Sequence, residues 1–439
     1  MVPHVKKFGS IAVTFLVAIF AVFALLQFTR VSAAEVPAAR GAGLALSPQK
    51  VDAGSSGAGP WLLVANMVTS NLSIVNTANG VVYGPFLQDQ LGTGGGGRFD
   101  VAVTPDGRTA LISNFGDSAV FLVNISDPLH PSLITSVTLP FFAEDIDISP
   151  DGQYALVADG GFSPYLASIN IPSATLVYTA ELGDASAQGV AIAPDGTVVF
   201  PDYFGHSVHT TLLGEMGVIT YANPITYANT YSLPYPGVAL TDTAGLPRPV
   251  NVGIAPDGQT VIVCSSISET VDIYRIIAPG VLTFTGVVTG LHGTDELYTD
   301  TSYSGPGVQS VAFNFTGDKA YASINNIRMA DITGTNSGDR LAVLNITGPG
   351  QVSLAAGGVV TLPHKTGSQL FGVDTLAVAG NKVYVAYPTV SSEDVLRPLA
   401  IVDLTDYSVT STMVLSQEVS IPTGVAVVPI RVYLPVILR

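Results

Sequence analysis

A short apolar segment recurs seven times along this chain and narrows the folds open to it. Successive copies begin about 44 to 65 residues apart. Four strands of about 5–6 residues with their turns need roughly 40–50 residues, so the spacing predicts one four-stranded antiparallel sheet per copy, with insertions in the longer intervals. The copies are Val101–Pro105, Ile146–Pro150, Val190–Pro194, Val252–Pro256, Val311–Phe315, Leu376–Ala379 and Val425–Pro429.

Turn and packing chemistry support the repeat. In four copies the segment runs into Pro-Asp-Gly, at residues 105–107, 150–152, 194–196 and 256–258. Proline presets φ in such a turn, and glycine supplies a positive φ. The second residue is alanine or glycine in six copies, as expected where inner strands crowd around a shared axis. Asp147 takes this position in the second copy, and we expect it to be hydrogen-bonded or to reach solvent in the channel.

The two ends of the repeat region complement each other. Trp61–Asn66 and Leu72–Asn76 match the second and third strands of the repeat, with no first strand before them. Val425–Pro429 is a first strand with no second and third strands after it. Pairing the last strand with the first sheet completes both and closes the ring. The sequence therefore predicts an all-β, seven-bladed β-propeller over residues 60–430, with four-stranded antiparallel blades.

Three of these features resemble a known family. Val64-Ala-Asn66, Pro-Asp-Gly followed by a strand, and Ser73-Ile-Val-Asn-Thr77 are similar to the YVTN-type β-propeller repeat of secreted and surface proteins. The resemblance covers about residues 60–430, with a more distant likeness to lactonase-like and quinoprotein amine dehydrogenase-like propellers. It implies a seven-bladed ring with a surface-binding or structural role.

The N-terminus has the features of an export signal. His4, Lys6 and Lys7 precede an apolar run from Ile11 to Phe28, and residues 32–34 are small enough for signal peptidase. Residues 1–34 are therefore a signal peptide, or an N-terminal anchor if uncleaved; only the anchor would attach the protein to a membrane. Both alternatives predict an extracytoplasmic protein, secreted or attached to the cell envelope. Residues 35–59 are expected to form a flexible linker, and 431–439 an apolar C-terminal tail.

Charge and cysteine content exclude some functions. The net charge of −16 argues against nucleic-acid binding, which needs a basic surface. Cys264 is the single cysteine, so no intrachain disulfide can form, and we expect this side chain to be buried. We expect the protein to be a monomer. The sequence contains no Gly-x-Ser-x-Gly and no His-Glu-x-x-His motif.

Polar residues recur just before the inner strands and form a first set of candidate ligand-binding residues. At a propeller channel mouth they would form an oxygen-rich ring, which suits a hard cation such as Ca²⁺. The alternative is that they are solvated and bind nothing, and no metal site is assigned to them. The set contains Asp100, Glu144, Asp145, Gln188, Asn251, Gln309 and Asp374.

Tyrosines in two predicted insertions form a second set. The insertions, Leu213–Pro249 and Leu291–Val308, are predicted to share one face of the ring. Tyrosine combines a stacking surface with a hydroxyl group, which suits contact with a protein or a glycan. The alternative is that these rings pack the insertions onto the blades. The set contains Tyr227, Tyr231, Tyr235, Tyr298 and Tyr303.

Three functions fit these features. The first is an extracytoplasmic binding or scaffold module that uses the loops of one face. The second is a propeller hydrolase of the lactonase type, or a quinoprotein-type oxidoreductase, with a site at the channel mouth. Its acid–base candidates are Glu144, Asp145, His292 and His364. The third is a purely structural envelope component without a ligand.

Overall fold

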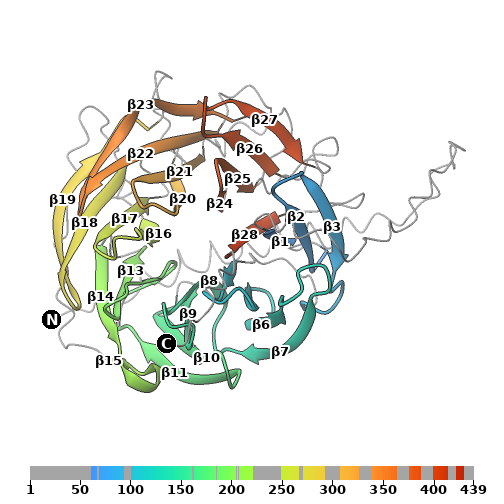
Figure 1. Ribbon diagram of the computed structural model, residues 1–439. Helices are drawn as coiled ribbons and strands as arrows, with labels where there is room; N and C mark the ends of the chain where they lie inside the picture. Colours follow the sequence, from blue (N-terminus) through green and yellow to red (C-terminus); the bar gives the residue numbers. More distant parts are fainter. Residues whose placement is uncertain are drawn as a thin grey trace, which may run out of the picture. The chain divides into compact units, whose positions relative to one another are not determined.

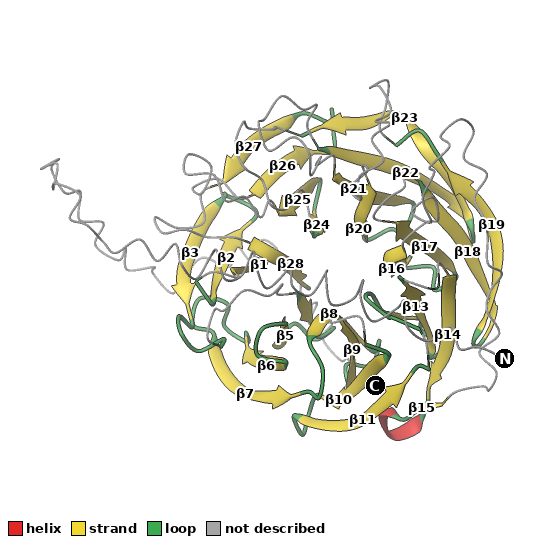
Figure 2. Cartoon of the chain, turned by 180° about the vertical axis from the view of Figure 1, so that it is seen from behind, coloured by secondary structure: helices red, strands yellow, loops and turns green. Residues whose placement is uncertain are grey.

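The computed structural model places the repeat region in a ring of seven sheets (Figures 1 and 2). It describes residues 61–66, 69–92, 100–160, 163–183, 185–203, 205, 207–220, 249–265, 270–291, 307–325, 339–362, 375–386, 399–413 and 422–429. All structural statements below refer to these residues. Within them, no helix has the length and apolar composition needed to cross a membrane.

Each sheet is a blade of four antiparallel strands, numbered from the axis outward. Blade 1 contains β28 (Pro422–Val428), β1 (Trp61–Asn66), β2 (Asn71–Asn76) and β3 (Val81–Phe86). Blade 2 contains β4 (Val101–Val103), β5 (Thr109–Asn114), β6 (Ala119–Asn124) and β7 (Ser132–Thr138). Blade 3 contains β8 (Ala143–Ile148), β9 (Tyr154–Asp159), β10 (Tyr165–Asn170) and β11 (Thr175–Glu181).

The remaining four blades follow the same order. Blade 4 contains β12 (Ala191–Ile192), β13 (Thr197–Asp202), β14 (Ser207–Leu213) and β15 (Ile219–Thr220). Blade 5 contains β16 (Pro249–Ile254), β17 (Thr260–Ser265), β18 (Val271–Ala278) and β19 (Val281–Val288). Blade 6 contains β20 (Gly307–Phe313), β21 (Lys319–Asn325), β22 (Arg340–Gly348) and β23 (Gln351–Thr361). Blade 7 contains β24 (Leu376–Ala379), β25 (Lys382–Ala386), β26 (Leu399–Asp403) and β27 (Val409–Met413).

The predicted blade count and ring closure are confirmed. All seven repeat segments provide the innermost strand of a blade. The last of them, β28, pairs antiparallel with β1, so that Val428 faces Trp61 and Ala426 faces Leu63. The final strand thus occupies the innermost position of the first blade (Figure 1).

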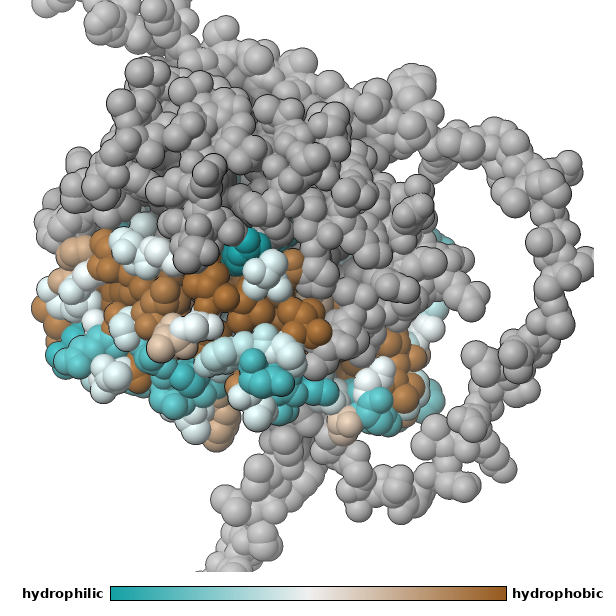
Figure 3. Space-filling view, turned by 90° about the horizontal axis from the view of Figure 1, so that it is seen from above, coloured by the Kyte–Doolittle hydropathy of each residue, from teal (hydrophilic) through white to brown (hydrophobic). Residues whose placement is uncertain are grey.

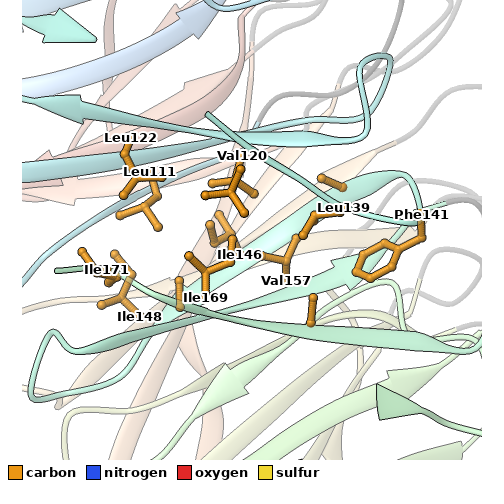
Figure 4. Close-up of a cluster of buried hydrophobic side chains, with 14 residues drawn as sticks. Leu111, Val120, Leu122, Leu139, Phe141, Ile146, Ile148, Val157, Ile169 and Ile171 are labelled. Carbon is orange, nitrogen blue, oxygen red and sulfur yellow. The ribbon is translucent and has the colours of Figure 1, made fainter. Parts of the chain in front are cut away.

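The hydrophobic core lies between neighbouring blades. Alternate residues of a strand point to opposite faces of its sheet, and both faces of each blade are covered. In β1, Leu63 packs into the cluster shared with blade 2, whereas Leu62 packs into the cluster shared with blade 7. Figure 4 shows the corresponding cluster between blades 2 and 3, where Leu111 and Val120 face Ile148 and Ile169. This arrangement explains the continuous apolar runs in the second and third strands.

The Pro-Asp-Gly turns close the hairpins between first and second strands. The Asp106 carboxylate accepts hydrogen bonds from the Arg108 N–H at 3.0 Å and the Thr104 hydroxyl at 2.6 Å. Gly107 has a φ of 66°, as the turn requires. These turns also meet around the ring, since a Cβ on Gly258 would lie 3.2 Å from Pro194 of the preceding blade.

The blades have two different ends. We call the end with the first-to-second and third-to-fourth connections the turn face, and the other end the loop face. Connections on the turn face are short, from residues 279–280 at the shortest to 125–131 at the longest. On the loop face, residues 221–248, 289–306 and 326–339 connect strands. In Figure 3, apolar residues occupy the middle of the visible flank and hydrophilic residues gather along one border.

The structure corrects the start of the largest predicted insertion. Leu213 ends β14, a 3₁₀ turn covers Glu215–Gly217, and β15 follows at Ile219–Thr220. The first part of the segment predicted to be an insertion therefore supplies the outer strand of blade 4. A short strand flanked by glycine and polar residues gives little periodic signal, which is why the sequence pattern did not reveal it.

Candidate functional site

Three aspartates link the inner strands of blades 2, 3 and 4. Asp100 precedes β4, whereas Asp145 and Asp147 belong to β8. The Asp145 carboxylate accepts the backbone N–H of Val190, and the Asp147 carboxylate accepts that of Ile192, both at 2.7 Å. Asp100 accepts the backbone N–H of Ile146 at 3.3 Å. Each carboxylate thus reaches the inner strand of the next blade, where no strand pairing connects the two sheets.

Asp100 and Asp145 form a carboxyl pair. Burial raises the pKa of Asp145 well above its usual range, and the charges of Asp100 and Asp147 raise it further. The Val190 N–H acts in the opposite direction. Because its pKa is raised, Asp145 holds its proton to a higher pH than an ordinary aspartate does.

Asp147 lies two residues further along the same strand. Burial raises its pKa to about 6, and the charge of Asp100 adds to this, whereas the N–H groups of Ile192 and Ile148 lower it. The expectation that Asp147 is hydrogen-bonded is confirmed. Its second oxygen accepts the Ile148 N–H at 2.8 Å.

The other predicted channel-mouth residues have separate surroundings. A Cβ on Gly160 would overlap the Glu144 carboxylate, and the Glu144 carbonyl accepts the Ser113 hydroxyl. Gln188 is almost fully buried. Asn251 lies in β16 opposite Cys264, and the Gln309 amide donates to the Gly307 carbonyl at 3.4 Å.

The structure therefore brings only part of the predicted set into contact. The charge of Asp100 raises the pKa of Asp145, and it also raises the pKa of Asp147, which was not in the set. Asp374, Tyr227, Tyr231, Tyr235, Tyr298, Tyr303, His292 and His364 lie outside the described residues. Within the described ranges, no three His, Cys, Asp or Glu side chains are placed to hold a metal ion, and calcium binding stays a prediction.

An aromatic pair lies at the loop face beside these carboxyl groups. Phe115 follows β5, and Phe142 precedes β8. Their rings stack with centroids 4.7 Å apart and an interplanar angle of 12°, and Phe142 is 40% exposed. Phe141, the residue before Phe142, stacks on Tyr165 with ring centroids 6.0 Å apart. Sequence reasoning missed this pair, because neither phenylalanine belongs to the repeated segment.

A buried histidine network in blade 4 was also missed. His209 Nε2 lies 3.0 Å from the Ser207 hydroxyl and 3.4 Å from the Asp202 carboxylate. The ring stacks on Phe200, and its side chain is 1% exposed. Burial opposes ionisation of Asp202, but hydrogen bonds from His209, Ser186 and Gly205 outweigh it and lower its pKa.

This network does not have the geometry of a catalytic triad. A nucleophilic triad uses one ring nitrogen for the serine and the other for the carboxylate. Here the same nitrogen, Nε2, faces both Ser207 and Asp202. Its place at the buried end of β13 and β14 indicates a structural role.

Comparison with known proteins supports the fold. No family model matches the chain, and no curated protein matches it. A functionally unknown protein from Desulfotomaculum acetoxidans superposes with a TM-score of 0.61 at 17% identity, covering 84% of this chain and 99% of that one. The periplasmic gluconolactonase PpgL of Pseudomonas aeruginosa gives 0.60 at 16%, with coverages of 85% and 99%. A 6-phosphogluconolactonase candidate from Bacteroides fragilis gives 0.60 at 14%, with 86% and 100%.

At these identities the likeness concerns the fold alone. The predicted likeness to lactonase-like propellers is thus confirmed at the level of architecture. Membership of the YVTN-type family stays a prediction.

Proposed function

We propose that this chain is an extracytoplasmic binding or scaffold module that presents the loop face of its propeller to a partner protein or a glycan. The observation that carries this proposal is the difference between the two faces. Residues 221–248, 289–306 and 326–339 all connect strands on the loop face, whereas the turn face has only short hairpins. Long connections held by a rigid scaffold are the usual place for binding residues.

The use of the carboxyl groups also favours binding over catalysis. Asp145 and Asp147 accept backbone N–H groups of the next blade, so they have a structural role that a free catalytic base does not have. The predicted export signal supports a location outside the cytoplasm. The periplasmic PpgL shows that this fold occurs there in another protein.

A loop deletion tests the proposal. The chain from residue 35 onward is screened on a glycan array and against envelope proteins, and then compared with a variant in which a short Gly-Ser linker replaces residues 222–247. We expect the intact chain to retain a ligand and the variant to lose it at an unchanged melting temperature. A blank screen, together with unchanged surface association of the variant, would contradict the proposal.

Lactone hydrolysis is the second candidate, and the Asp100–Asp145 pair is the observation that favours it. In such a reaction the carboxylate takes a proton from water as the water oxygen bonds to the lactone carbonyl carbon. The carboxylic acid gives its proton to the ring oxygen as the ring C–O bond breaks. Two neighbouring carboxyl groups, of which Asp145 has a raised pKa, offer one group for each of these roles, and two similar folds carry lactonase names.

A pH-stat assay on a panel of lactones tests this candidate. Loss of turnover in the variant carrying both Asp100→Asn and Asp145→Asn, with the fold retained, would support it. Turnover equal to that of the parent chain would remove these residues from the reaction.

A further inference from the structure

The Phe115–Phe142 pair is an exposed aromatic surface on the loop face. Both connections that carry it, residues 115–118 and 139–142, are described in full. The rings come from blades 2 and 3 and meet above the seam between them. Phe142 in this stacked pair is 40% exposed, so part of its apolar surface stays unburied. Burying apolar surface stabilises a fold, and its exposure here indicates a contact surface.

Two acidic residues lie close to this pair along the chain. Asp117 lies in the same connection as Phe115, and Glu144 follows Phe142 by two residues. Ser113, two residues before Phe115, donates to the Glu144 carbonyl and accepts the Asp100 N–H at 3.0 Å. This places the Asp100–Asp145 pair at the same corner of the ring.

The described basic residues lie elsewhere. Lys319 and Lys382 begin second strands, and Arg108 directly precedes one, so all three are at the turn face. Arg275 is hydrogen-bonded to Gln259 next to a Pro-Asp-Gly turn, and Arg340 is buried. Among the described residues, those around the phenylalanines on the loop face are therefore aromatic and acidic.

We propose that the Phe115–Phe142 pair docks a lysine- or arginine-bearing segment of a partner protein. The cationic group lies against a phenylalanine ring, and Asp117 and Glu144 supply the opposite charge. A cation is attracted to the face of an aromatic ring, and the attraction is stronger where the contact is shielded from water. The chain's net charge of −16 draws such a partner toward it. This inference rests on the proposed binding function and names its partner class.

The test measures, by calorimetry, the binding of a hexalysine peptide to the chain from residue 35 onward. Phe142→Ala is expected to weaken binding roughly 2- to 30-fold, which corresponds to the loss of one cation–aromatic contact. Phe142→Trp is expected to restore or strengthen it. The matched control is Ile134→Ala, which removes another exposed apolar side chain, 52% exposed, from β7 on the outer flank.

The outcomes separate the inference from the proposed function. Equal binding by Phe142→Ala and the parent chain, with a loss only on adding salt, would show general attraction to an acidic protein and overturn the inference. Binding of neutral sugars at Phe142, with no response to hexalysine, would also overturn it while leaving the binding function intact. A chain that binds no protein and no glycan would remove both.

Discussion

The Asp147 carboxylate accepts the backbone N–H of Ile192 at 2.7 Å and thereby joins two blades. The equivalent residue is alanine or glycine in the other six blades, so no carboxylate occupies this position there. In the seam between blades 7 and 1, a neutral hydroxyl takes a similar part, since Thr375 donates to the Thr423 carbonyl at 2.7 Å. Titratable links between inner strands are thus concentrated in blades 2 to 4.

This concentration predicts how stability changes with pH. Burial raises the pKa of Asp147 to about 6 and that of Asp145 well above its usual range. A carboxyl whose folded pKa exceeds its unfolded value stabilises the fold below the unfolded value, and this contribution is lost as pH rises through the folded pKa. For Asp147, we expect the free energy of unfolding to increase by about 1 kcal/mol from about pH 7.5 to about pH 5.

Two variants isolate the contribution of Asp147. Asp147→Asn removes the titrating group, so the pH dependence of unfolding by urea should become shallower. Asp318→Asn is the matched control, because hydrogen bonds from Thr316 and Asn314 lower the pKa of that exposed carboxyl and it titrates below this window. An unchanged slope in Asp147→Asn would show that Asp147 does not take up the proton. Asp272, whose pKa burial also raises to about 6, accounts for part of the remaining slope.

Gly253 gives a prediction about packing near the axis. A Cβ at this position would lie 2.8 Å from both Val311 and Phe313 of the next blade. Gly253→Ala should therefore destabilise the fold by about 1–3 kcal/mol through overpacking. Gly286→Ala in β19 is the control, since no atom lies within 4 Å of its Cβ position. Equal melting temperatures for the two variants would contradict the close approach at Gly253.

The inner strands could be predicted from sequence because their signals are local. Alternating apolar residues followed by Pro-Asp-Gly mark a strand and its turn without reference to the rest of the chain. Ring closure could also be predicted, because Trp61–Asn66 lacks a first strand and Val425–Pro429 lacks the strands that should follow it. Both inferences need only the order of the strands.

The contacts of the candidate site could not be predicted in the same way. Alignment of the repeats placed Asp100 and Asp145 in equivalent positions, but the effect of one charge on the other depends on the distance between neighbouring blades. The stacking of Phe115 on Phe142 depends on two connections from different blades reaching the same corner. Neither residue type nor spacing carries that information in a single sequence.

Removing the final strand tests ring closure. Deletion of residues 422–439 takes β28 out of blade 1 and exposes the edge of β1, which is buried from Leu62 to Asn66. We expect a large drop in melting temperature, because one blade loses its innermost strand and the ring opens. Deletion of residues 430–439 alone is the control and should leave the melting temperature nearly unchanged. A chain without β28 that melts like the parent would show that the ring does not depend on this pairing.

Cys264 provides an internal probe of the same opening. Its side chain is fully buried between blades 5 and 6, and burial raises the pKa of its thiol, with the charge of Asp272 adding to the effect. A protonated, buried thiol is a poor nucleophile, so Ellman's reagent should leave the native chain unmodified and react fully in concentrated guanidinium chloride. The chain lacking residues 422–439 should react much faster than the chain lacking 430–439. Fast labelling of the intact native chain would show that blades 5 and 6 separate without unfolding.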